Sequence, residues 1–345
     1  PSRKKRLNKG DKVLVPSLCW STSVFPLIQH DLVPVFLDID FENLNIIFKE
    51  EDFSDVKGIM LVHALGNSTN MKKIMEIAEK KDLIVIEDTC ESMGSTFNNK
   101  ILGTFGDFGT FSFYFSHHIT TIEGGMVICN NEEDYYLLKC LRSHGWDRDQ
   151  KIRKKYSNID SRFCFINTGY NVRSTELNAI MGLVQLGKFN HMSKLRKKNR
   201  KRVIDALMNH PLNKNLINYH KETKGCDTNW FSIPLYIEDE NIDKDDFLSY
   251  LEENGIENRP VISGNFTRQP VLKLYNLDVD FRKFPNVEKV NKQSFYLGCP
   301  TFYDFDENKI ADIILNYWGP IKFRGRIKIY KRNYRINLGF LWGKI

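Results

Sequence analysis

Short apolar runs alternate with amphipathic segments over the first 130 residues of the chain. The apolar-rich runs 12–16, 83–88 and 109–115 predict strands that are buried on both faces. Residues 70–82 carry apolar side chains at helical spacing, which predicts an amphipathic helix. The same criteria predict helices over 21–32 and 132–145 and strands over 34–39, 57–65 and 124–130. This alternation is typical of an α/β protein with a mostly parallel sheet covered on both sides by helices.

The second half of the chain has a different pattern. A long helical pattern begins at Asn171 and becomes strongly basic along its length, which suits a helix that leaves a large domain and enters a smaller one. Beyond it we expect an α+β domain with a strand over 229–238, a helix over 243–255 closed by Gly255, and a last helix over 304–318. The predicted division is a large domain over 1–195, a small C-terminal domain over 196–316, and a basic tail over 317–345.

Composition excludes several classes of protein. Of the 345 residues, 41% are hydrophobic and 27% are charged, as in ordinary globular proteins, and no apolar run approaches the roughly 18 residues that span a bilayer. The start, PSRKKRLNKGDK, lacks the apolar segment of a secretory signal. The seven cysteines have no CxxC spacing, which argues against a metal cluster and a disulfide framework. We therefore expect a cytoplasmic protein without a membrane span.

The net charge of +7 is concentrated at the C-terminus. Residues 317–345 contain no acidic residue, and their eight Lys and Arg residues exceed the whole surplus, so the body of the chain is close to neutral. The interleaved aromatic residues are compatible with contact to RNA or anionic lipid. An accessory terminus without a partner is the interpretation that we favour, and we expect no nucleic-acid partner.

Polar residues follow three of the predicted strands. Trp20 follows the first strand, Asp88 closes the strand over 83–88, and His117 and His118 follow the strand over 109–115. Ligands of parallel α/β sheets bind outside the carboxyl ends of the strands, so these residues are candidates for a binding site. Taken one at a time, each also has a structural interpretation: Asp88 as a helix N-cap, and the aromatic residues as parts of the core.

Five segments taken together indicate a family. GDKVLVPSLCWST, VIEDTCESMGS, LGTFGDFGTFSFYFSHHITTIEGGMVICN, LRSHGW and GYNVRSTELNAIMG occur in one order and at one set of intervals. Together they resemble the DegT/DnrJ/EryC1/StrS sugar aminotransferases, over about residues 8–316. The resemblance implies the type I fold of the pyridoxal-phosphate-dependent transferases, with a mostly parallel large domain and a smaller α+β C-terminal domain.

The resemblance also implies a cofactor, pyridoxal 5′-phosphate or its amine form pyridoxamine 5′-phosphate, with glutamate as amino donor. It implies that Asp88 pairs with the pyridinium nitrogen and that Trp20 stacks on the ring. Glu91 falls where aminotransferases often carry a Gln near the ring, and Ser112 matches a hydroxyl group that contacts the phosphate. A ring kept protonated by a carboxylate accepts electrons better.

Three further residues have roles implied by the same resemblance. Asn171 matches a residue that contacts the phosphate from the neighbouring subunit, which implies a homodimer with shared active sites. His144, in RSHGW, and Arg259, in RPVISGNF, are candidate contacts to the substrate.

His117 is the departure from the usual family motif, which has a Lys at this position. That Lys binds the cofactor covalently and moves the proton, and an imidazole cannot form the covalent bond. With a His at this position, the sequence resembles the branch of the family that removes the C3 hydroxyl group of nucleotide-linked 4-keto-6-deoxy sugars for O-antigen or capsule. GDP is the nucleotide that this resemblance favours. A related branch carries an iron–sulfur cluster, for which the cysteine spacing offers no motif. His117 is then the catalytic base, since its unperturbed pKa is about 6.5.

The family's Ser/Gly-rich turn, which binds the cofactor phosphate at a helix start, has no equivalent that we find in this sequence. A truncated, inactive member of the family is therefore one alternative to a dehydratase, and an aminotransferase without the Lys is another.

Overall fold

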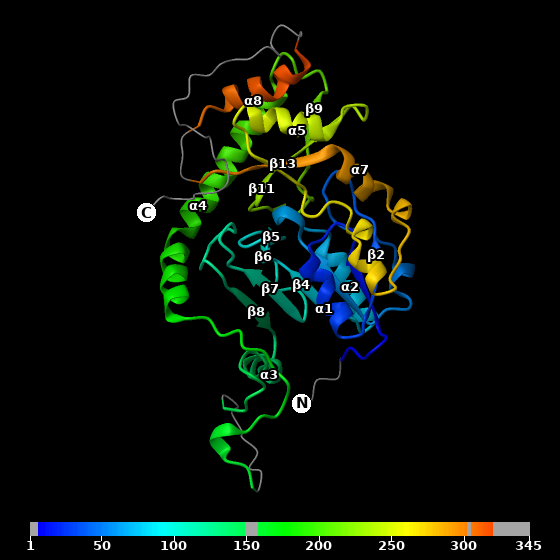
Figure 1. Ribbon diagram of the computed structural model, residues 1–345, viewed down its shortest axis with the longest axis vertical. Helices are drawn as coiled ribbons and strands as arrows, with labels where there is room; N and C mark the ends of the chain where they lie inside the picture. The colour runs from blue at the N-terminus through cyan, green and yellow to red at the C-terminus, as the bar shows by residue number, and fades with distance from the viewer. Residues whose placement is uncertain (1–5, 149–157, 302–304, 320–345) are drawn as a thin grey trace.

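A six-stranded sheet forms the centre of the larger part of the molecule, in a computed structural model that describes residues 6–148, 158–301 and 305–319. Its strands are β1 (Lys12–Pro16), β2 (Val33–Leu37), β3 (Gly58–Val62), β4 (Ile84–Asp88), β7 (Phe108–Ser112) and β8 (Gly125–Cys129). They lie in the order β2-β1-β3-β4-β7-β8, of which Figure 1 labels β2, β4, β7 and β8. All neighbours are parallel except β7 and β8, so the predicted mostly parallel sheet is confirmed.

Successive residues of the strands point into two different cores. Val13 and Val15 of β1 lie in a core with α1 (Ser21–Gln29) and with residues from 261 to 290. Leu14, between them, lies in a second core on the opposite face with α2 (Met71–Lys80). This explains the continuous apolar runs, because a strand covered on both faces buries the side chains of both faces and favours apolar residues throughout.

The smaller part of the molecule surrounds an antiparallel sheet in the order β12-β13-β11-β9. Its strands are β9 (Ile217–Tyr219), β11 (Ser232–Ile237), β12 (Asn258–Pro260) and β13 (Ser294–Gly298), with helices α5 (Lys244–Glu253) and α8 (Glu307–Leu315) packed on it. Further elements are the short strands β5 (Thr96–Phe97), β6 (Lys100–Ile101) and β10 (Cys226–Asp227), and the helices α3 (Glu132–Arg142), α6 (Val271–Leu274) and α7 (Pro285–Gln293). Gly255 has a φ of 82°, as expected of a glycine that ends a helix.

The long helix α4 (Glu176–Met208) connects the two parts. Thr175 and Asn178 cap its start by accepting hydrogen bonds from each other's backbone N–H groups. Its C-terminal end packs in the small-domain core, whereas α6 and α7 pack against the core of the larger part. Tyr317 and Trp318, which we assigned to the basic tail, also pack in the small-domain core. The rest of the predicted tail, 320–345, lies outside the described residues.

The strand predicted over 109–115 is too long. β7 ends at Ser112, because His117 N–H bonds to the carbonyl group of Tyr114 and turns the chain. Tyr114 and Phe115 are 38% and 46% exposed, so the run does not continue as a buried strand. Within the described part of the chain, no helix has the length and apolar character needed to cross a membrane.

Candidate active site

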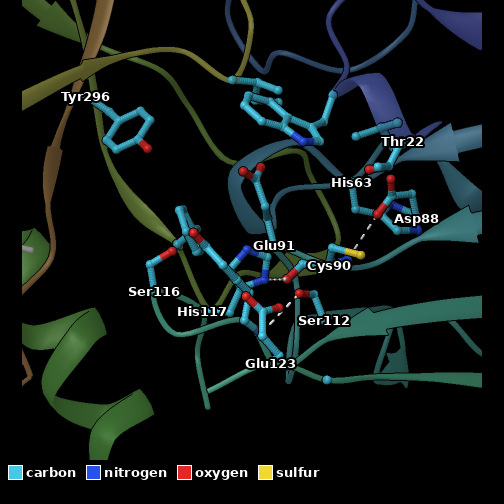
Figure 2. Close-up of a pocket in the computed structure, with 16 residues that line it drawn as sticks. Thr22, His63, Asp88, Cys90, Glu91, Ser112, Ser116, His117, Glu123 and Tyr296 are labelled. Carbon is cyan, nitrogen blue, oxygen red and sulfur yellow. Dashed lines mark hydrogen bonds between the residues drawn. The ribbon is translucent and has the colours of Figure 1, made fainter. Parts of the chain in front are cut away.

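The carboxyl ends of three neighbouring strands meet at one cavity. The pairing register places Val62 of β3 beside Asp88 of β4, and Asp88 beside Thr110 of β7. The ends of these strands and the residues just beyond them, including Asp88 and Ser112, line a cavity of about 520 Å³ (Figure 2). This volume is in the usual range for small-molecule sites. The wall consists of Trp20, Thr22, Val62, His63, Asp88, Cys90, Glu91, Ser112, Tyr114, Ser116, His117, Glu123, Gly124, Phe231, Ile262 and Tyr296.

Five of the predicted site residues come together in this cavity: Trp20, Asp88, Glu91, Ser112 and His117. Trp20 lies directly before α1 and is 56% exposed, so its indole ring is a wall of the cavity and not part of the core. Ser112 ends β7, and its oxygen accepts the N–H of Tyr114 at 3.2 Å. The Ser112 hydroxyl hydrogen is therefore available to donate to a ligand.

Asp88 is held by neutral donors. Its carboxylate accepts the hydroxyl group of Ser23 at 2.6 Å and the backbone N–H of Cys90 at 3.2 Å. Residues 89–95 form turns rather than a helix, so the interpretation of Asp88 as a helix N-cap is wrong. No Lys or Arg lines the described wall of the cavity, and a ligand with a protonated nitrogen would give Asp88 a charged partner.

Glu87, one residue before Asp88, points to the other side of the sheet. It is fully buried and accepts four hydrogen bonds, from His63 Nε2 at 2.9 Å and from the backbone N–H groups of Gly103, Phe105 and Gly106. Burial opposes ionisation, but the bonds from His63 and from the backbone outweigh it and hold the pKa of Glu87 below its usual value. Glu87 thus fixes the end of β4, and with it the direction of Asp88.

His117 is positioned as a base. Its Nδ1 lies 2.7 Å from the carbonyl oxygen of Cys90, and an oxygen that only accepts requires the hydrogen on Nδ1. The Nε2 atom is therefore unprotonated in the neutral ring. Burial lowers the pKa of His117, against the hydrogen bond to Cys90. The ring of Phe231 packs edge-on against the imidazole at 5.3 Å and restricts its rotation.

His118 has a structural role. It is buried, and its Nε2 lies 2.7 Å from the carbonyl oxygen of Asn229 in the chain segment that precedes β11. Burial lowers the pKa of His118 well below its usual value, so the ring is neutral. The adjacent histidines thus differ: His117 borders the cavity, and His118 connects the loop between β7 and β8 to the segment before β11.

Glu91 is another titratable wall residue with a displaced pKa. Burial raises the pKa of Glu91 to about 7, and the single hydrogen bond from Leu65 N–H, at 3.1 Å, opposes the change only weakly. A large part of Glu91 therefore carries a proton at neutral pH.

The other three predicted residues do not line the cavity. Asn171 and His144 lie side by side, because Ser143 pairs with Asn171 and Arg173 contacts both side chains at 3.2–3.3 Å. Their segment, with α3, lies at the end of the molecule opposite α8 (Figure 1). Arg259 in β12 pairs across the sheet with Tyr296, a wall residue, and donates to Glu257 at 2.6 Å.

Several wall residues were not predicted, including His63, Ser116, Phe231 and Tyr296. A signal for His63 was present, because β3 ends at Val62 and His63 follows it as Trp20 follows β1. The prediction of a strand over 57–65 hid this position. Phe231 and Tyr296 come from the small domain, and nothing in their local sequence indicates the cavity.

Comparison with known proteins agrees with this geometry. The profile of the DegT/DnrJ/EryC1/StrS aminotransferase family matches residues 3–316. A GDP-4-keto-6-deoxy-D-mannose 3-dehydratase from Escherichia coli O55:H7 is 38% identical over 317 residues, which cover 89% of this chain and 80% of that protein. The solved structure of an E. coli GDP-4-keto-6-deoxy-D-mannose-3-dehydratase with bound hydrated pyridoxal phosphate superposes with a TM-score of 0.82 at 35% identity, covering 91% of this chain and 82% of that one.

A second structure of a GDP-4-keto-6-deoxymannose-3-dehydratase, with a trapped pyridoxal phosphate–glutamate geminal diamine, superposes with a TM-score of 0.81 at 34% identity, covering 89% of this chain and 81% of that one. These similarities extend over both the large sheet and the small domain, and they confirm the predicted fold. The chain belongs to the DegT/DnrJ/EryC1/StrS aminotransferase family.

Proposed function

We propose that the chain is a pyridoxal-phosphate-dependent dehydratase that removes the C3 hydroxyl group of a GDP-linked 4-keto-6-deoxy sugar, in the synthesis of a 3-deoxy sugar for O-antigen or capsule. One observation carries the proposal: the described wall of the cavity holds the imidazole of His117 and no lysine. An aminotransferase needs a lysine to bind the cofactor covalently. A histidine leaves the cofactor untethered and still provides a base. The named 3-dehydratase relatives support the choice of reaction and of GDP.

The wall residues fit the cofactor. The half-buried carboxylate of Asp88 accepts from the neutral donors Ser23 and Cys90, and a protonated ring nitrogen would add a charged donor. The indole of Trp20 offers an aromatic face for the ring, and the Ser112 hydroxyl group would donate to the phosphate.

The residues of this chain then have separate tasks. When bound, the aminated cofactor supplies an amine that condenses with the sugar ketone and a ring that accepts an electron pair. His117 removes a proton through its unprotonated Nε2, and the Cys90 carbonyl group fixes the tautomer in which that atom is free. Asp88 keeps the ring nitrogen protonated. Phe231 holds the imidazole in place.

The test is a reconstituted reaction. Purified protein with pyridoxal phosphate, glutamate and GDP-4-keto-6-deoxymannose is expected to release ammonia continuously, and the His117→Asn variant is expected to release almost none. Continuous formation of an amino sugar without ammonia would overturn the proposal in favour of an aminotransferase.

We further propose a homodimer in which each cavity receives residues from the partner. The described wall contains no Lys or Arg to bind a phosphate, whereas Arg173, Asn171 and His144 form a polar cluster away from their own cavity. An apolar surface also extends over β8 and the first half of α4, with Leu177 and Leu183 75% and 71% exposed. Exposed apolar surfaces of this kind are typical of interfaces.

Subunit complementation tests the shared site. His117→Asn and Asn171→Ala chains are each expected to have low activity, and their co-expression is expected to restore part of it, because a hybrid dimer contains one intact site. Two variants that remain inactive together, or a wild-type chain that is active as a monomer, would contradict the proposal.

A further inference from the structure

Among the titratable groups of the cavity wall, His117 and Glu91 have pKa values that are displaced in opposite directions. Burial lowers the pKa of His117 and raises the pKa of Glu91 to about 7. A neutral imidazole is a base and a neutral carboxyl group is an acid, so near neutral pH the same cavity holds one of each. Figure 2 shows both side chains projecting into the cavity.

The geometry determines which oxygen of Glu91 donates. The backbone N–H of Leu65 contacts Oε2 at 3.1 Å, and an N–H group requires an acceptor, so the proton of the neutral carboxyl group lies on Oε1. The Leu65 peptide is itself fixed, because its carbonyl group accepts the N–H of Phe231 at 2.9 Å. Oε1 has no hydrogen-bond partner among the described residues, and the side chain lines the cavity.

Loss of a hydroxyl group requires an acid. The electron pair of the breaking C3–O bond leaves with the oxygen, and hydroxide is a poor leaving group unless it takes up a proton. The electron pair that takes the place of the lost C3–O bond in the sugar comes from the C–H bond whose proton His117 removes. His117 can return to the hydroxyl group only the proton that it has just removed, whereas a neutral carboxyl group holds a proton before the step begins.

We propose that Glu91 is the catalytic acid of the dehydration, which gives its Oε1 proton to the departing C3 hydroxyl group so that water leaves. The inference rests on the proposed function. In this step the O–H bond of Glu91 breaks as the new O–H bond of water forms, His117 becomes an imidazolium and Glu91 a carboxylate. The pair of charges cancels, so the cavity keeps its net charge.

The surroundings of Glu91 keep it protonated. Asp88 of β4 faces it with a negative charge, and Tyr296 of β13 contributes a phenol whose own pKa burial raises. Arg259, which pairs with Tyr296 across the sheet, donates to Glu257 at 2.6 Å. The resemblance described above places a Gln at this position in aminotransferases, whose reaction expels no hydroxyl group and needs no acid for one.

A substrate with a different leaving group at C3 distinguishes a role of Glu91 as an acid from any other role of this residue. Glu91→Gln keeps the size of the side chain and an acceptor for Leu65 N–H, but an amide does not transfer a proton. With the natural hydroxyl substrate we expect turnover to fall by about 10²-fold or more. With a substrate that carries fluorine in place of the C3 hydroxyl group, we expect wild type and Glu91→Gln to eliminate fluoride at similar rates, because fluoride leaves without a proton.

His117→Asn is the matched control, because a lost base slows both substrates alike. If Glu91→Gln slows both substrates equally, or slows neither, Glu91 is not the acid. If wild-type protein eliminates neither leaving group, the proposed function itself fails, which is a different result.

A second measurement needs neither cofactor nor substrate. The infrared band of a protonated carboxyl group is expected to disappear with a midpoint near pH 7 in the cofactor-free wild type, and to be missing from Glu91→Gln. A wild-type spectrum whose carboxyl groups have all ionised well below pH 6 would overturn the assignment, even if the variant does not fold.

Discussion

The imidazole Nδ1 of His117 donates a hydrogen bond to the carbonyl oxygen of Cys90 over 2.7 Å, and this contact makes Nε2 the unprotonated nitrogen of a ring that lines the cavity. His117→Asn retains a donor but no base, and we expect turnover to fall by a factor on the order of 10²–10⁴. His117→Lys places an amine in the cavity, so we expect pyridoxal phosphate to be retained covalently after borohydride reduction. Mass spectrometry of the intact chain measures this, and an unmodified mass with undiminished dehydration would exclude the assigned role.

Asp88→Asn tests the charge that faces the cofactor nitrogen. A hydrogen bond to a charged group contributes roughly 1.5–3 kcal/mol, so we expect the dissociation constant of pyridoxal phosphate to rise about 10- to 100-fold. Ser23→Ala is the matched control, since it removes a neutral donor to the same carboxylate and leaves the charge. Absorbance titration gives both constants, and equal effects of the two variants would argue against a charged pair.

Glu87→Gln tests the buried anchor beneath the site. The amide replaces an acceptor of four hydrogen bonds, and we expect a loss of about 3 kcal/mol in the free energy of unfolding. The exposed Glu76→Gln is the control. Because the folded-state pKa of Glu87 lies below its ordinary 4.5, its contribution is present above pH 4.5 and is lost as pH falls through the folded value. Denaturant unfolding at several pH values should show this decrease in the free energy of unfolding at low pH in wild type and not in the variant.

The pH dependence of kcat/KM reports the acid and the base. His117 must be neutral, and burial lowers its pKa, so activity should persist below pH 6.5. Glu91 must be protonated, so activity should fall with the loss of one proton above about pH 7. We expect the Glu91→Gln variant to lack this alkaline limb, and an unchanged limb in the variant would assign it to another group.

Leu183→Glu tests the exposed apolar surface of α4. Leu183 is 71% exposed in the single chain, so a charge there should leave the chain folded. Buried in a dimer interface, the same charge would be unpaired, and we expect the protein to elute as a monomer in size-exclusion chromatography with light scattering. The exposed Asn190→Asp on the same helix is the control. A dimer unaffected by Leu183→Glu would place the interface elsewhere.

The large sheet was predictable because its strands are covered on both faces. β1, β4 and α2 lie within a residue or two of their predicted ranges, since continuous apolar runs and helical spacing leave few alternatives. The short strands β12 and β13 were missed because their three to five residues mix polar and apolar side chains. β7 was extended too far, because aromatic residues favour strands locally and the turn at Tyr114 depends on the His117 backbone hydrogen bond.

The residues of the candidate site could be predicted where they lie at the ends of predicted strands or match the family motifs. Trp20, Asp88 and His117 end or follow predicted strands, so their positions follow from the sheet, and the family resemblance supplied Glu91 and Ser112. The partners of these residues were not predictable. The Ser23 bond to Asp88 joins residues 65 positions apart, and the Cys90 bond to His117 depends on the backbone path after β4.

The mass of the sugar product after a single turnover is the most direct test of the account. The cofactor-loaded protein is first treated with glutamate to aminate the cofactor, and it is then separated from free glutamate. Mixed with GDP-4-keto-6-deoxymannose, it should yield a sugar that has lost the C3 oxygen and kept its ketone, with one ammonia released for each product. A product that keeps all its hydroxyl groups and carries an amine at C4 would contradict the claim that His117, in place of a lysine, makes this cavity a dehydratase.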